Sequence, residues 1–219
     1  MKGLLVALLL VFGPGDVVPE ELVAGEKYEQ YFYAQRIPDD IFELMQGRSY
    51  KDNCTVPRED LRYLRLLHRD IDGRARVGEM VVAKGIAQDV LDIFRQLYEA
   101  SYPIESVLLV DRFGGDDERS MLANNSSSFN FRSSPHSGKI SKHSTGEAVD
   151  INPLYNPYFK VRQGRTIVDP EASRPYVDRS ASFPYKIEKG DLCHRLFLAH
   201  GFKWGGGWAS MKDWQHFEK

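Results

Sequence analysis

Cysteine is scarce in this chain: Cys54 and Cys193 are the only two among 219 residues. In an oxidising compartment they could form one disulfide, and closing so long a loop would stabilise the fold by about 4 kcal/mol. Their spacing leaves that disulfide and a pair of buried free thiols equally open. A nucleophilic cysteine is less well supported, because no matched base accompanies either residue.

An excess of charge of one sign is also missing. The formal net charge is −2 at pH 7, so the chain has no basic footprint and we expect no nucleic-acid partner. The composition, 42% hydrophobic and 27% charged, is ordinary for a soluble globular protein, and the length predicts a single domain. Nor does any later stretch of the sequence hold a hydrophobic run long enough to cross a bilayer.

The N-terminus differs from the rest of the chain. Lys2 precedes an apolar run of ten residues, 3–12, which has the length of a signal peptide and is too short to span a membrane. We expect residues 1–24 to form a leader that directs export, with cleavage near residues 13–15 or after Ala24. An uncleaved anchor or a buried N-terminal strand is the alternative. No cysteine lies near the end of the run, so a lipoprotein anchor is not supported.

Two short segments carry most of the chemical information. Residues 141–150 contain His143 and Asp150, and Asp213 and His216 stand near the end of the sequence. Two imidazoles and one carboxylate form a ligand set that suits zinc, while Asp213 is a candidate base for an attacking water. Either segment alone occurs often by chance, but together they predict one site of a zinc hydrolase.

The spacing of the first segment requires a reversal of the chain. A fully extended chain would hold His143 and Asp150 more than ~20 Å apart, too far to bind one ion. Residues 144–146 are the natural turn, because they end in a glycine that tolerates positive φ. Residues 147–151 then predict a short strand that places Ala148 and Asp150 on one face.

The second segment needs a bend as well. Asp213 and His216 are three residues apart, so a straight strand would point them to opposite faces of a sheet. A turn or a bent strand between them would let both reach one site.

These signatures resemble the VanY-like D-alanyl-D-alanine carboxypeptidases and the related L-alanyl-D-glutamate peptidases, zinc peptidases of bacterial cell walls that share a fold with the hedgehog signalling domain. The resemblance rests on Ser-x-His-x-x-Gly-x-Ala-x-Asp at 141–150 and on acid-x-x-His at 213–216, and covers roughly residues 50–219. It extends to flanking segments, namely Ser120-Met121, Asn124-Asn125, Phe129-Asn130-Phe131-Arg132, Asn152-Pro153 and Gly205-Gly206-Gly207-Trp208.

The resemblance implies a role for each matching residue. His143, Asp150 and His216 would hold one zinc ion, and Asp213 would take a proton from the attacking water and pass it to the leaving amine. Many members of the family have Glu at the position of Asp213. This chain departs from that pattern, because the shorter side chain of Asp gives the base less reach.

Family members also use an arginine upstream of the first ligand to stabilise the oxyanion that develops during hydrolysis. Arg132 is the first choice for this role. Arg112 is the second choice, because it follows a predicted strand.

The resemblance further implies a function and a place in the cell. We expect a zinc-dependent peptidase that acts on peptidoglycan stem peptides, in the manner of a D-Ala-D-Ala carboxypeptidase, in the periplasm or at the cell envelope. An L-Ala-D-Glu-type endopeptidase and a non-catalytic, zinc-stabilised cell-wall binding module are the alternatives. We expect a monomer without a stable membrane span.

Hydrophobic periodicity and turn residues predict the elements around these motifs. Helices are expected at 39–45, at 86–100 and from Asp191 to a stop at Gly201; strands are expected at 61–68 and 78–83 around a turn at 70–73, and at 107–110. A polar loop, 113–142, and a proline-rich insert, 154–186, are expected to border the cleft.

Alternating strands and helices indicate the α+β class. We expect one domain, residues 25–219, in which an antiparallel sheet bears the zinc site and helices pack on its back. The resemblance implies the same hedgehog/DD-peptidase-like fold.

Overall fold

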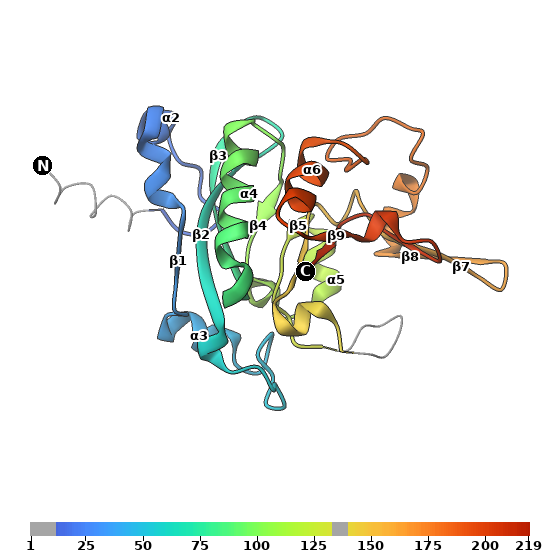
Figure 1. The fold of residues 1–219 in the computed structure, drawn as a ribbon, viewed down its shortest axis with the longest axis horizontal. Helices are drawn as coiled ribbons and strands as arrows, with labels where there is room; N and C mark the ends of the chain where they lie inside the picture. Colours follow the sequence, from blue (N-terminus) through green and yellow to red (C-terminus); the bar gives the residue numbers. More distant parts are fainter. Residues whose placement is uncertain (1–11, 133–139) are drawn as a thin grey trace, which may run out of the picture.

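The computed structural model describes residues 12–132 and 140–219 (Figure 1). Its helices are α2 (Glu20–Val23), α3 (Asp39–Met45), α4 (Ala87–Glu99), α5 (Asp117–Leu122) and α6 (Leu192–Ala199). Its strands are β1 (Tyr33–Gln35), β2 (Leu61–Arg69), β3 (Ala75–Ala83), β4 (Ser106–Val107), β5 (Asn125–Ser126), β6 (Ala148–Asp150), β7 (Tyr158–Arg162), β8 (Arg165–Asp169), β9 (Lys203–Trp204), β10 (Lys212–Asp213) and β11 (His216–Glu218).

A three-stranded antiparallel sheet of order β1-β2-β3 forms one half of the molecule. The predicted hairpin is confirmed, although β3 begins at Ala75, three residues earlier than expected, opposite Arg69. Gly73 in the connecting turn has φ +76°, a conformation that glycine adopts without the steric cost of a side chain.

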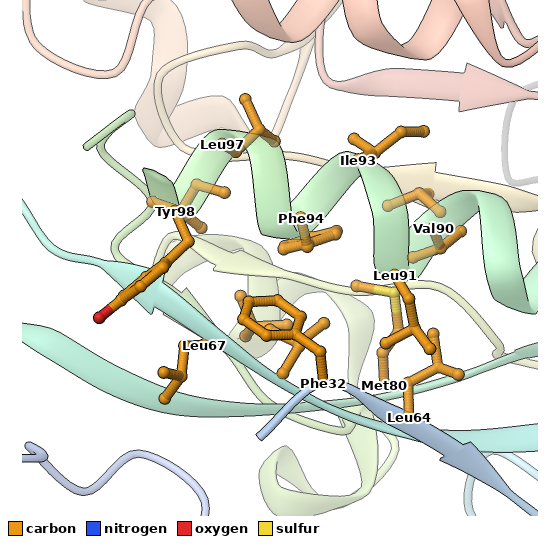
Figure 2. Close-up of a cluster of buried hydrophobic side chains, with 14 of the residues drawn as sticks. Phe32, Leu64, Leu67, Met80, Val90, Leu91, Ile93, Phe94, Leu97 and Tyr98 are labelled. Carbon is orange, nitrogen blue, oxygen red and sulfur yellow. The ribbon is translucent and has the colours of Figure 1, made fainter. Parts of the chain in front are cut away.

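Helix α4 covers this sheet (Figure 2). Its apolar side chains recur at helical spacing, and Val90, Phe94 and Leu97 are buried in the core cluster that also contains Leu64 and Met80 of the strands. Leu91 points from the helix towards the strands in Figure 2. Burying one such side chain contributes about 1.5–3 kcal/mol, so this layer is the main core of the protein. The predicted helix at 86–100 is confirmed.

The other half of the molecule contains three small sheets, of order β6-β11-β9, β10-β7-β8 and β4-β5. Helix α6 packs behind the first of them, where the rings of Phe197 and Phe217 stack with centroids 4.2 Å apart. Asp191 caps α6 by accepting a hydrogen bond from the backbone N–H of His194 at 2.7 Å, as expected of a helix that starts there. Antiparallel sheets and packed helices confirm the α+β class. The more specific assignment to a hedgehog/DD-peptidase-like fold stays a prediction.

Two predictions between the halves are wrong. The strand expected at 107–110 ends at Val107, because the side chain of Asn125 binds both the N–H and the C=O of Leu108, at 2.8 and 2.9 Å. The segment expected to be a loop, 113–142, contains α5 and β5. Asp116 caps α5 by accepting from the N–H of Arg119 at 3.1 Å, a signal present in the sequence that was missed.

The described part of the expected leader lies along the edge of β3. The N–H groups of Gly15 and Val18 donate to Val77 and Ala75 at 2.7 and 2.8 Å, and the side chains of Val18 and Val23 are buried. Most of the apolar run 3–12 lies outside the described residues. Among those described, no helix is long and apolar enough to cross a bilayer.

The two cysteines remain apart. Cys193 is buried in the main core, whereas Cys54 packs against a second cluster beside α3, and both are free thiols. Of the two alternatives left open by the sequence, the structure therefore has the unpaired thiols.

Candidate metal centre

His143 is held by a tight 3₁₀ turn, Lys142–Thr145. The hydroxyl of Ser141 accepts a hydrogen bond from the N–H of His143 at 3.2 Å, and Gly146 closes the turn with φ +72°. A Cβ at Gly146 would lie 2.6 Å from the backbone nitrogen of Ala83, so the turn fits against β3 only with glycine. The predicted reversal is confirmed at the predicted place.

The register of two strands brings the other ligands together. In the antiparallel pair of β6 and β11, Asp150 lies directly opposite His216. Residues opposite each other in such a pair point to the same face of the sheet. Asp213 belongs to β10, in a different sheet, so the chain bends between Asp213 and His216 as the spacing requires.

The three side chains converge on one point. The Nε2 of His143 lies 3.2 Å from the Nδ1 of His216 and 3.1 Å from an oxygen of Asp150, and the Nδ1 of His216 lies 3.1 Å from the other oxygen of Asp150. In residues 12–132 and 140–219, this is the one group of three or more His, Cys, Asp or Glu side chains whose ligand atoms gather within 4.8 Å. Two imidazole nitrogens and a carboxylate oxygen are donors that fit zinc.

Hydrogen bonds outside the cluster orient both imidazoles. The Nδ1–H of His143 donates to the carbonyl oxygen of Ser128 at 2.7 Å, which leaves Nε2 free to bind a metal. The Nε2 of His216 lies 3.3 Å from the carboxylate of Glu218, so His216 presents Nδ1. Glu218 was not predicted from the sequence, although residues two apart on a strand share a face.

The charges of the cluster favour a cation at its centre. Burial alone would raise the pKa of Asp150, yet His143 and His216 beside it hold that pKa well below its usual range. Burial would lower the pKa of His216, but hydrogen bonds to Asp150 and Glu218 raise it to about 10. A divalent ion would supply the positive charge that this arrangement stabilises.

Asp213 lies in the same pocket, but its carboxyl group differs from that of Asp150 in the direction of its pKa shift. Burial raises the pKa of its carboxyl to about 7, against the lowering effect of His216. Its Oδ1 is buried and has no hydrogen-bond partner among the described residues. A carboxyl group that titrates near neutral pH suits proton transfer.

The pocket around these side chains has a volume of about 310 Å³. Arg132 lines it and forms an ion pair with Asp117 at 2.6 Å. Arg112 does not line it, because its guanidinium binds the buried carboxylate of Glu79 at 2.8 Å. The structure thus places the first choice of arginine at the site and the second choice in a structural ion pair.

A comparison with protein families now bears on these residues. Residues 135–219 match the model of a family described as D-alanyl-D-alanine carboxypeptidase. This C-terminal part of the chain is therefore similar to that peptidase family. The matched region contains His143, Asp150, Asp213 and His216, whereas Arg132 lies just before it. Comparison with curated proteins found no match, and neither did comparison with solved structures.

Two walls of the pocket come from the two segments expected to border it. Helix α5 contributes Asp117 and Met121, and the hairpin of β7 and β8, which extends from the body in Figure 1, contributes Tyr158, Lys160 and Asp169. Both segments therefore lie at the site.

The tryptophans near the C-terminus do not all reach this pocket. Trp208 lines it, with its ring 5.5 Å from that of His216. Trp204 instead packs against Phe217 and donates its indole N–H to the carbonyl of Trp214 at 2.9 Å. Of the three tryptophans, only Trp208 thus lines the pocket.

Proposed function

We propose that this protein is a zinc-dependent peptidase that hydrolyses amide bonds in peptidoglycan stem peptides, with the action of a D-Ala-D-Ala carboxypeptidase. The observation that carries the proposal is the convergence of His143, Asp150 and His216 in one pocket with Asp213. The match of residues 135–219 to a carboxypeptidase family supports it. The proposal includes export to the periplasm or cell envelope, where such a substrate is found.

The residues of the pocket have separate roles in hydrolysis. Zinc held by His143, Asp150 and His216 would activate water and polarise the scissile carbonyl. Asp213 accepts the proton of the water and returns one to the leaving amine, because its buried carboxyl group lines the same pocket as the three ligands. Arg132 donates to the oxyanion, and its ion pair with Asp117 holds it in place meanwhile.

The non-catalytic alternative gives no account of Asp213. A buried carboxylate oxygen without a partner costs desolvation free energy, and a purely structural zinc site has no need of one. An endopeptidase would use the same four side chains and would differ in how the pocket holds the end of the substrate.

Mass spectrometry of purified muropeptides tests the proposal. We expect the zinc-loaded protein to remove one terminal alanine from pentapeptide forms and His216→Ala to remove none. Asp213→Asn should bind zinc as tightly as the wild type but turn over at least about 100-fold more slowly. Release of a larger fragment would establish the endopeptidase, and the absence of any zinc-dependent product would favour the binding module.

A further inference from the structure

Three cationic side chains line the pocket among the described residues, and they are not equivalent. Arg132 pairs with Asp117 at 2.6 Å, and Lys142 pairs with Glu147 at 2.8 Å. Lys160 forms no ion pair with any residue in 12–132 or 140–219. It is half-buried at the wall of the pocket, so its charge is available to a bound molecule.

Among the described residues, anionic side chains outnumber the cationic ones around this pocket. Its acidic lining residues are Asp117, Asp150, Asp169, Asp213 and Glu218. Asp117, Asp150 and Glu218 are each paired with an arginine or histidine of the pocket, and those partners are therefore not free to bind a negatively charged substrate group. Lys160 is the exception, since no described residue forms an ion pair with it.

The strand register places Lys160 on the side of the base. Asp213 of β10 lies directly opposite Tyr158 of β7, and Lys160 follows two residues later on the same face of β7. Two residues of a strand span roughly 7 Å. The four-carbon stem of lysine is long enough to cover this distance towards the base.

The chemistry of the reaction orients the substrate in the direction from Asp213 to Lys160. Hydrolysis breaks one C–N bond; the acyl fragment gains the hydroxyl of water, and Asp213 delivers a proton to the departing nitrogen. The leaving residue must therefore lie beside Asp213. If that residue is the last one of the peptide, its carboxylate follows its nitrogen by a single carbon atom and lies between Asp213 and Lys160.

We propose that Lys160 binds the C-terminal carboxylate of the substrate peptide and thereby determines that the last residue is removed. The proposal rests on the proposed peptidase function and names the residue that gives this site its preference for the end of a peptide.

Two matched peptides test the role of Lys160. Both are stem-peptide analogues that end in D-alanyl-D-alanine, one with a free carboxylate and one with a carboxamide. We expect the zinc-loaded wild type to show a kcat/KM on the order of 10-fold to 100-fold higher for the acid, through a lower KM. Lys160→Gln should bring the two values together, and Lys160→Arg should retain most of the preference.

Two further measurements separate binding from turnover and from net charge. Calorimetry with Asp213→Asn should give a lower Kd for the acid than for the amide, and Asp213→Asn/Lys160→Gln should lose the difference. Lys84→Gln, an exposed lysine on the connection between β3 and α4, removes the same charge away from the pocket and should behave as the wild type.

The outcomes distinguish the two proposals. Hydrolysis of both peptides with equal kcat/KM, or a preference for the acid that survives in Lys160→Gln, would overturn the role of Lys160 and leave the peptidase intact. Hydrolysis of neither peptide by the zinc-loaded wild type would overturn the proposed function itself.

Discussion

Glu218 shows how one side chain outside the ligand set can govern the metal centre. It lies two residues after His216 on β11, and its carboxylate is 3.3 Å from the ring nitrogen that His216 does not turn towards the cluster. An ionised partner there raises the basicity of the ligand nitrogen and fixes the ring. We therefore predict that Glu218→Gln weakens zinc binding by about 10-fold to 100-fold.

Competition with a chromophoric chelator measures this effect. Glu188→Gln is the matched control, because Glu188 is exposed, pairs with Lys186 and does not line the pocket. Equal zinc affinities for Glu218→Gln and the control would show that the hydrogen bond to His216 has no influence on the metal.

Gly146 is a second single residue on which the site depends. Its φ of +72° and the 2.6 Å approach of Ala83 leave no room for a side chain. Placing an alanine in a left-handed backbone conformation costs about 1–2 kcal/mol. We predict that Gly146→Ala lowers the free energy of unfolding by more than this cost, because the added methyl group also meets Ala83. Zinc affinity should fall too, because the turn carries His143.

Gly164→Ala is the control for the backbone conformation alone. Gly164, in the β7–β8 turn, has a φ of +74°, and no atom lies within 4 Å of a Cβ built there. Denaturant unfolding of the two variants should therefore differ by the cost of the contact with Ala83. Equal losses of stability would mean that β3 moves to accommodate the added methyl group at no further cost.

At the scale of the elements, local patterns were predictable and distant contacts were not. Helix α4 and the β2–β3 hairpin follow from periodicity and turn residues within a few positions of the chain. The end of β4 depends on the side chain of Asn125, which lies 17 residues from Leu108. The pairing of Asp150 with His216 joins positions 66 residues apart. Sequence spacing indicated that these two residues meet but gave no register.

The N-terminal segment yields a prediction at the same scale. A leader cleaved after Ala24 would remove Val18 and Val23, whose burial contributes about 1.5–3 kcal/mol each, together with the hydrogen bonds to β3. We therefore predict cleavage near residues 13–15. A chain that begins at residue 25 should unfold at a lower denaturant concentration than one that begins at residue 13.

N-terminal sequencing of the protein isolated from its native cells gives the start of the mature chain directly. A mature start at Gly25, or equal stability of the two truncated chains, would contradict the prediction. Retention of the whole apolar run 3–12 would instead support an uncleaved anchor.

For the whole molecule, a buried histidine far from the metal centre couples stability to pH. His68 of β2 is 2% exposed, and one of its ring nitrogens is 2.7 Å from the carbonyl oxygen of Ile104. Burial lowers the pKa of His68 to about 4. Between pH 6.5 and about 4 the unfolded chain therefore binds a proton that the folded protein does not bind.

The sign of the effect follows from this difference. The free energy of unfolding should be insensitive to His68 above pH 6.5 and should fall below it, by roughly 3 kcal/mol in total once both states are protonated. His68→Asn keeps a donor for Ile104 and cannot titrate, so its curve should lack this decrease. Urea unfolding of both proteins across this pH range, in the presence of a chelator, measures the effect. The carboxylates of the site contribute equally to both proteins, so their contribution cancels when the two free energies of unfolding are subtracted. Parallel curves would show that His68 takes up its proton equally in the folded and unfolded chains, and that acid destabilisation arises elsewhere.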